Sequence, residues 1–206
     1  PRLRPARQAP GRALPASGHD VSWDVVNPNL ADGGRPLSTV KFRWENEGWT
    51  LDCGLGPQRS QVAIRVSAQW GIQQVLLFRD LDDPDLWLAT DGSGRWGEVN
   101  GAHRTDLDGC HLVAIVGSPI THCIAIRQLP LEVGHGAELK TAIVDPEKLS
   151  VVAGTMRFER IAQHRWRYTR LSPIDSTLQE LVEVDVDEFG LVIDEPEQFI
   201  RARGDA

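Results

Sequence analysis

Cysteine is scarce in this chain of 206 residues. The three that occur, Cys53, Cys110 and Cys123, allow at most one disulfide and leave one thiol over. Small secreted domains that depend on disulfides carry a denser set. The sequence therefore excludes a disulfide-rich secreted scaffold.

Long apolar runs are also missing. A membrane-spanning helix needs roughly 18 to 20 consecutive apolar residues, and no run approaches that length. The first 20 residues lack the apolar central region of a signal peptide. We therefore expect a cytoplasmic protein with no transmembrane segment. Because the chain begins with Pro1 rather than Met, a missing upstream segment remains an open alternative.

Lysine is scarce, and acidic residues outnumber basic ones by 29 to 22. Lysine occurs three times against 19 arginines, and the formal net charge is −7. A surface that binds nucleic acid needs clustered positive charge. The composition therefore predicts no nucleic-acid partner.

The chain length suits one domain, and its apolar share of 41% supports a core of normal size. Residues 1–18 are rich in Pro, Arg, Ala and Gly, a composition that buries too little apolar surface to offset the entropy of ordering. We expect residues 1–18 to form a disordered or loosely attached tail, and residues 19–206 to form a single domain.

Apolar residues alternate with polar ones along much of the chain. Val62, Ile64 and Val66 alternate with Ala63 and Arg65, which is typical of a strand with one buried face. About a dozen such segments follow at intervals of about 8 to 12 residues, separated by turn signals. The pattern predicts an all-β fold, a curved antiparallel β-roll or an open or half β-barrel, and residues 195–203 allow a short C-terminal helix. An incompletely closed roll would enclose a cavity.

Residues 106–131 are read as a strand, a Gly-Ser-Pro corner and a second strand. This stretch resembles the bacterial family named Putative glycolipid-binding, formerly a domain of unknown function. The matching residues are Leu107, Asp108, Gly109 and Cys110, then Ser118, Pro119, Ile120 and Thr121, then Ile124, Ala125, Ile126, Arg127 and Leu129, with further likeness at 86–96, 168–169 and 184–196.

The resemblance implies a fold similar to the carriers that move lipoproteins across the bacterial periplasm. It also implies a lipid or glycolipid-like small molecule as the partner. The chain departs from the family at His122, where Asn is usual, and at Gln128, where a second Arg is usual.

The sequence contains no complete catalytic or cofactor-binding motif. Gly92, Gly94 and Gly97 fit the dinucleotide-binding spacing, but Asn100-Gly101 ends the segment where that motif needs a helix. His122 and Cys123 are neighbours, and in a strand they would point to opposite faces. We therefore expect no enzyme activity, no metal and no cofactor.

Tryptophan is the abundant aromatic residue, with seven copies against one Tyr. Inward-facing Trp and Arg side chains of a curled sheet would suit a ligand with an apolar chain and a polar head. The alternative is that the Trp side chains fill the core and that Arg127 pairs with a carboxylate. The candidate ligand-binding residues are Arg127, Trp166, Tyr168, Trp87, Trp96 and, at the position of the family's Asn, His122.

The function predicted is non-enzymatic binding of a lipid or glycolipid-like amphiphile in the cavity of the curved sheet. One alternative is an enzyme acting on a hydrophobic substrate in that cavity, and another is a structural or protein-binding β module with a filled core. The sequence determines neither the ligand nor the oligomeric state.

Overall fold

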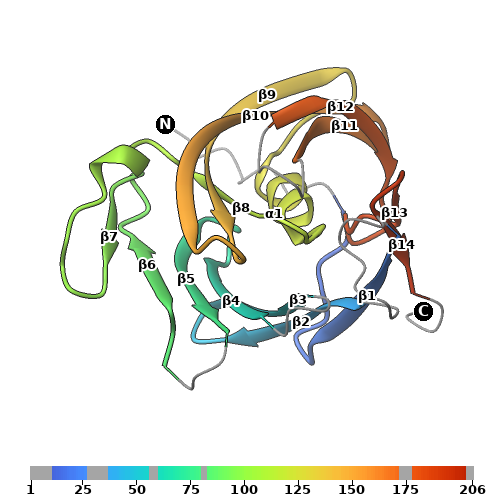
Figure 1. Cartoon of the computed structure of the whole chain (residues 1–206). Helices are drawn as coiled ribbons and strands as arrows, with labels where there is room; N and C mark the ends of the chain where they lie inside the picture. Colours follow the sequence, from blue (N-terminus) through green and yellow to red (C-terminus); the bar gives the residue numbers. More distant parts are fainter. Residues whose placement is uncertain (1–10, 27–36, 56–59, 80–82, 172–177, 203–206) are drawn as a thin grey trace, which may run out of the picture.

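Two β-sheets curl around one short helix (Figure 1). The computed structural model describes residues 11–26, 37–55, 60–79, 83–171 and 178–202. Neither sheet closes on itself, so the molecule is an open roll rather than a closed barrel. The predicted fold, a curved and mostly antiparallel β architecture, is confirmed.

The larger sheet has nine strands, all paired antiparallel, in the order β13-β14-β1-β2-β3-β4-β5-β6-β7. Most neighbours are joined by short turns, but β14 pairs with β1 and thereby joins the two ends of the chain. The strands are β1 (His19–Val25), β2 (Leu37–Glu45), β3 (Gly48–Leu55), β4 (Ser60–Ser67), β5 (Ile72–Phe78), β6 (Leu86–Thr90), β7 (Trp96–Glu98), β13 (Asp194–Glu195) and β14 (Phe199–Arg201).

The smaller sheet has five strands in the order β12-β11-β10-β9-β8. Its strands are β8 (Leu112–Ile115), β9 (His135–Asp145), β10 (Ser150–Ala162), β11 (Arg165–Leu171) and β12 (Leu178–Asp185). The strands β8 and β9 run parallel, whereas the other pairs of this sheet are antiparallel. A parallel pair cannot be joined by a tight turn, and the helix α1 (Ile120–Gln128) lies in the required crossover.

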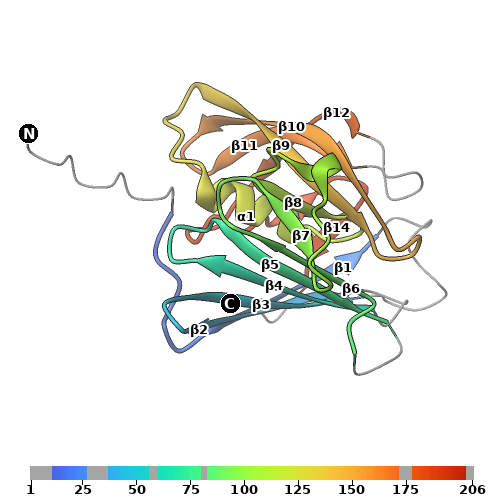
Figure 2. The same ribbon diagram turned by 90° about the vertical axis from the view of Figure 1, so that its left-hand side faces the viewer.

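Alternation determines which side chains face inward. In β4, Val62, Ile64 and Val66 are buried, while Gln61 and Arg65 lie on the outer face. The same alternation continues across β1 to β5, so their apolar sides line the inside of the curl. A sheet with one buried face needs a second layer to cover it, and the smaller sheet and α1 supply that layer (Figure 2).

The helix α1 occupies the centre of the roll. Eight of its nine residues are buried, with Ile120, Ile124 and Ile126 among them. Its sequence has no continuous polar face, so burial by the two sheets stabilises it. Figure 1 looks along this helix and shows the strands arranged around it.

Local contacts start the helix at this point. The carbonyl of Pro119 accepts hydrogen bonds from the backbone N–H groups of His122 and Cys123. The Thr121 hydroxyl accepts a hydrogen bond of 2.7 Å from the N–H of Ile115, which ties the helix to the end of β8. Because proline fixes its own backbone and has no N–H to satisfy, it suits the start of a helix.

Two local predictions were wrong. The stretch 106–131 was expected to be two strands around a corner. Its corner is present, but α1 follows the corner in place of the second strand. Residues 195–203 were expected to allow a short helix, but the end of β13 and the whole of β14 are found there. The β-branched residues of α1 favour a strand locally, and burial on every side outweighs that preference.

The expected tail lies partly outside the described residues, namely at positions 1–10. Residues 11–18 are described, and they cross one end of the roll. The N–H of Arg12 donates a 2.6 Å hydrogen bond to the carbonyl of Glu188, and the side chain of Leu14 is buried. The domain boundary at residue 18 stays a prediction.

Within the described ranges, no helix combines the length and the apolar character that crossing a membrane requires.

Replacing Ile124 by Ala should test the central position of α1. Its side chain is fully buried, so we expect the free energy of unfolding to fall by about 2–4 kcal/mol, from lost burial and a residual cavity. The control is Val152→Ala on β10, where half of the side chain is exposed, with an expected change below about 0.5 kcal/mol. Urea denaturation of both variants measures the difference, and equal losses would contradict the central packing.

Candidate functional site

Two predicted site residues meet in the interior beside α1. The rings of His122 and Tyr168 stack with centroids 3.7 Å apart. The Tyr168 hydroxyl donates a 2.8 Å hydrogen bond to the carboxylate of Glu195, and His122 Nε2 lies 3.6 Å from the same oxygen. These side chains come from α1, β11 and β13, and all three are buried. The cluster therefore links the helix to both sheets.

The three predicted tryptophans lie apart from one another. Trp96 is buried on β7, and its Nε1 donates a 2.9 Å hydrogen bond to the carbonyl of Cys110. Trp166 is buried on β11, with the guanidinium of Arg160 5.9 Å from its ring centre. Trp87 lies on the outer face of β6 and is 38% exposed. These side chains do not surround one common cavity.

A hollow of about 570 Å³ opens at the C-terminal end of α1, and we call it the mouth hollow. Its volume falls within the range of about 300–1,000 Å³ that is typical of small-molecule sites. It is lined by residues of the N-terminal segment, by the turns at the ends of β2 to β5 and by the last turn of the helix. The lining residues are Gly11, Arg12, Ala13, Leu14, Trp44, Trp49, Ala68, Gln69, Trp70, Arg127, Gln128 and Pro130.

Three tryptophans form one wall of the mouth hollow. Trp44 and Trp49 are cross-strand partners in the β2–β3 hairpin, and their rings meet edge to face at 5.2 Å. Trp49 in turn stacks on Trp70 at 6.1 Å. Their exposed fractions fall from 41% at Trp44 to 7% at Trp49 and 3% at Trp70. The wall therefore runs from solvent into the interior and offers an accessible aromatic face at its outer end.

An unusual turn holds the inner end of this wall. Trp70 has a φ of 67°, in the left-handed region that bulky residues rarely adopt. The Ser67 hydroxyl accepts hydrogen bonds from the N–H groups of Gln69 and Gly71, at 3.2 and 3.1 Å. These bonds stabilise the turn and place the Trp70 indole against the end of α1.

Arg127, in the last turn of α1, forms the polar end of the mouth hollow. Only 5% of the residue is exposed, and its guanidinium carbon lies 4.4 Å from the centre of the Trp70 ring. Its Nη1 donates hydrogen bonds to the carbonyls of Phe189 and, at 3.3 Å, Arg12. Burial lowers the pKa of Arg127 to about 10, so the side chain still carries its charge at neutral pH.

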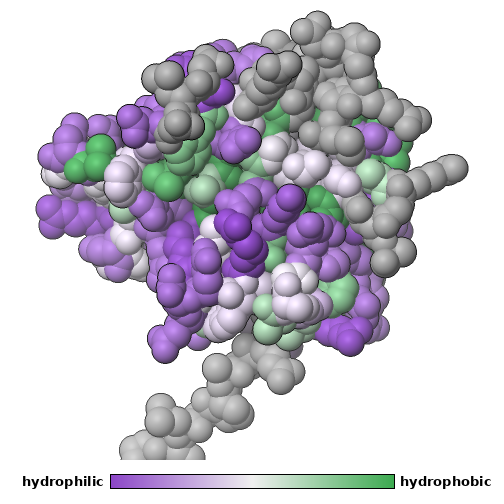
Figure 3. Space-filling model, turned by 90° about the horizontal axis from the view of Figure 1, so that it is seen from below, coloured by the Kyte–Doolittle hydropathy of each residue, from purple (hydrophilic) through white to green (hydrophobic). Residues whose placement is uncertain are grey.

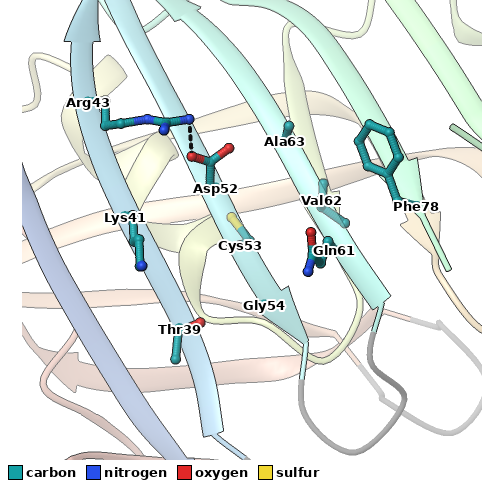
Figure 4. Close-up of a pocket in the computed structure, with 10 residues that line it drawn as sticks. All are labelled: Thr39, Lys41, Arg43, Asp52, Cys53, Gly54, Gln61, Val62, Ala63 and Phe78. Carbon is teal, nitrogen blue, oxygen red and sulfur yellow. Dashed lines mark ion pairs between the residues drawn. The ribbon is translucent and has the colours of Figure 1, made fainter. Parts of the chain in front are cut away.

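Two further hollows lie elsewhere. One of about 420 Å³ adjoins the mouth hollow on the far side of Arg12 and includes Trp166 and Arg160. Another of about 450 Å³ lies on the outer face of β2 to β5, where Arg43 pairs with Asp52 (Figure 4). Figure 3, seen from the side of β2 and β3, shows a largely hydrophilic surface with smaller hydrophobic patches between.

Among the predicted site residues, only Arg127 lines the mouth hollow. The aromatic residues beside it, Trp44, Trp49 and Trp70, were not predicted. A signal for two of them was present, because a hairpin turning at residues 45–48 places Trp44 opposite Trp49. The predicted ligand roles of Trp166, Tyr168, Trp87, Trp96 and His122 stay predictions.

The described part of the chain contains no group of three or more His, Cys, Asp or Glu side chains placed to hold a metal ion.

The fold and the mouth hollow define a class: a β-roll built around a buried helix, with an aromatic and basic opening at one end. The chain belongs to the family described as "Putative glycolipid-binding", whose sequence profile matches residues 37–201. This confirms the resemblance drawn from the sequence.

A solved structure shows the same fold. The crystal structure of a DUF1089 family protein from Pseudomonas aeruginosa superposes with a TM-score of 0.62 at 22% sequence identity. The match covers 98% of this chain and 100% of that chain. No curated protein matches the chain.

Replacing Tyr168 by Phe should show how much the buried cluster contributes to stability. Losing the hydrogen bond to Glu195 should lower the free energy of unfolding by about 1–3 kcal/mol, since a buried carboxylate loses a donor. The same change in a Glu195→Gln background should cost less, because the acceptor no longer carries a charge. Denaturant unfolding of the four proteins gives the coupling free energy, and a value of zero would contradict the contact.

The three thiols should resist alkylation in the folded protein. Burial raises the pKa of Cys123 to about 12, and it raises the pKa of Cys53 and Cys110 as well. Because the thiolate is the reactive form, we expect native protein at pH 8 to react with iodoacetamide at least about 100-fold more slowly than protein unfolded in guanidinium. Mass spectrometry of timed samples measures this, and a thiol labelled equally fast in both states would refute it.

The same shifts give the direction of a pH effect on stability. The folded state holds its thiol protons more tightly than the unfolded state, whose thiols titrate near pH 9. The contribution to stability is therefore complete below pH 9, and it is lost as the pH rises from about 9 towards 12.

Proposed function

We propose that this protein binds a lipid or glycolipid-like amphiphile non-covalently, and that the mouth hollow is the binding site. The observation that carries the proposal is the tryptophan wall, which is exposed at Trp44 and ends on a buried arginine, in a chain of the Putative glycolipid-binding family. The sequence had suggested the inside of the curled sheet as the site. Because α1 occupies that space, the open end of the roll is the better candidate.

Each part of the mouth hollow suits one part of an amphiphile. The outer indole of Trp44 gives a flat apolar face on which the C–H face of a sugar ring can pack, with N–H groups nearby for polar contacts. Leu14, Ala13 and Pro130 add apolar lining for the first carbons of an alkyl chain, each worth about 0.8 kcal/mol when fully buried. No covalent chemistry is part of this function.

Octyl β-D-glucopyranoside, used below its micelle concentration, is a simple probe of this proposal. We expect isothermal titration calorimetry to detect its binding to the wild-type protein. Trp44→Ala should raise the Kd about tenfold, because truncating an aromatic anchor typically costs more than about 1 kcal/mol.

Trp87→Ala is the matched control. Trp87 is about as exposed as Trp44, at 38% against 41%, but it lies on the outer face of β6, away from the mouth hollow. We expect its Kd to equal that of the wild type. Absence of heat in the wild type, or equal losses in the two variants, would argue against the mouth hollow as the site.

A further inference from the structure

We propose that the head group bound in the mouth hollow is anionic, and that Arg127 is the residue that pairs with it. This inference rests on the proposed function, since it names the chemical class of ligand for the same hollow. The shared chemistry is a carboxylate or a phosphate attached to the sugar or to the linker of an amphiphile.

The Arg127 guanidinium has no carboxylate paired with it among the described residues. Within the described ranges, its guanidinium donates only to main-chain carbonyls and lies over an indole, and its Nε has no hydrogen-bond partner. The carboxylate of Asp187 acts on it from a distance, but that group is paired with Arg201 at 3.1 Å. Arg12, also in the hollow, is balanced by Glu188. The mouth hollow therefore keeps one positive charge that no described carboxylate neutralises.

Two other partly buried arginines are paired with carboxylates. Arg104 is paired with Asp106 and Glu98, and Arg201 is paired with Asp187. These pairs are the usual arrangement, because a charge removed from water costs free energy unless an opposite charge compensates it. Arg127 departs from this arrangement, as Arg160 does, and it lines the mouth hollow, where a ligand could provide the missing charge.

A bound anion would offset the free energy that Arg127 loses through burial. Loss of hydration is the main reason that the pKa of Arg127 falls to about 10, so the charged form is held at a cost. A carboxylate or phosphate brought into contact would recover that cost, and the attraction is stronger there than in water because the surroundings are partly apolar. A guanidinium can donate more than one charge-assisted hydrogen bond to such a group.

The tryptophan wall would bind the sugar ring of the ligand. The wall of Trp44 and Trp49 adjoins Arg127 through Trp70, so a flat ring on the wall can carry its anionic substituent towards the guanidinium. The carbonyl of Arg12, 3.3 Å from Nη1, already places an oxygen atom beside it. A ligand that joins a ring to an anionic group matches both features at once.

A matched pair of probes tests the proposal. Octyl β-D-glucopyranoside and octyl β-D-glucuronide differ at C6, where a hydroxymethyl group is replaced by a carboxylate. We expect calorimetry at pH 7 and low salt to give a Kd at least about tenfold lower for the glucuronide. The preference should shrink at high salt, as an interaction between charges does.

Variants of two arginines identify the residue responsible. Arg127→Met keeps the apolar stem against Trp70, and it should remove the preference for the glucuronide, so that the ratio of the two Kd values falls to about one. Arg127→Lys keeps the charge and should retain part of the preference. The control is Arg160→Met, which removes an arginine that also lies over a tryptophan and also donates to carbonyls, but outside the mouth hollow. It should keep the full preference.

The outcomes separate this inference from the proposed function. If both glycosides bind equally to the wild type, the anionic head group is excluded and amphiphile binding stands. If neither binds, the proposed function fails. Glucuronic acid and inorganic phosphate carry no alkyl chain. If they bind as tightly as octyl glucuronide, the ligand is a free anion and an amphiphile is excluded. A preference that survives Arg127→Met would overturn the assignment of this residue.

Discussion

The burial of α1 at the axis of the roll is the constraint on which the remaining structure depends. Nine strands present an apolar inner face, and five more cover it only with the helix between them. A helix surrounded in this way needs no polar face, and its polar side chains must find partners inside. His122 meets this need in the cluster with Tyr168 and Glu195, and Arg127 emerges at the end of the helix against Trp70.

The same constraint is the reason that we propose a binding site at the end of the roll. An empty curled sheet could shield a whole alkyl chain, but here side chains of the helix fill the centre. The mouth hollow lies where the inward-facing positions of β2 and β3 run past the core, so Trp44 faces inward and still remains exposed. Beside it lies a charge that the described protein does not neutralise. The exposed aromatic surface and the charge without a paired carboxylate therefore both lie at the end of the roll, where the filled core meets solvent.

Elements with a clear local sequence pattern were predicted correctly, and elements without one were not. Strands with one buried face alternate visibly, so β4 and the hairpin of β2 and β3 could be predicted from local pattern. The segment 120–128 is rich in Ile and has no clear helical period of apolar residues, so it favours a strand by propensity. Arg127 was found as a candidate from the family resemblance, whereas Trp70 depends on a rare turn conformation that no short pattern predicts.

By itself the sequence determined a mostly β protein of the Putative glycolipid-binding family, because strand periodicity and family motifs are properties of local order along the chain. The tertiary structure alone decided that 120–128 is a central helix and that Tyr168 and His122 are stacked in the core. It also decided that Arg127 meets Trp70 beneath the N-terminal segment. These contacts are between residues far apart in the chain. The free energy that stabilises them comes from burying apolar surfaces of several segments against each other, so no single segment predicts them.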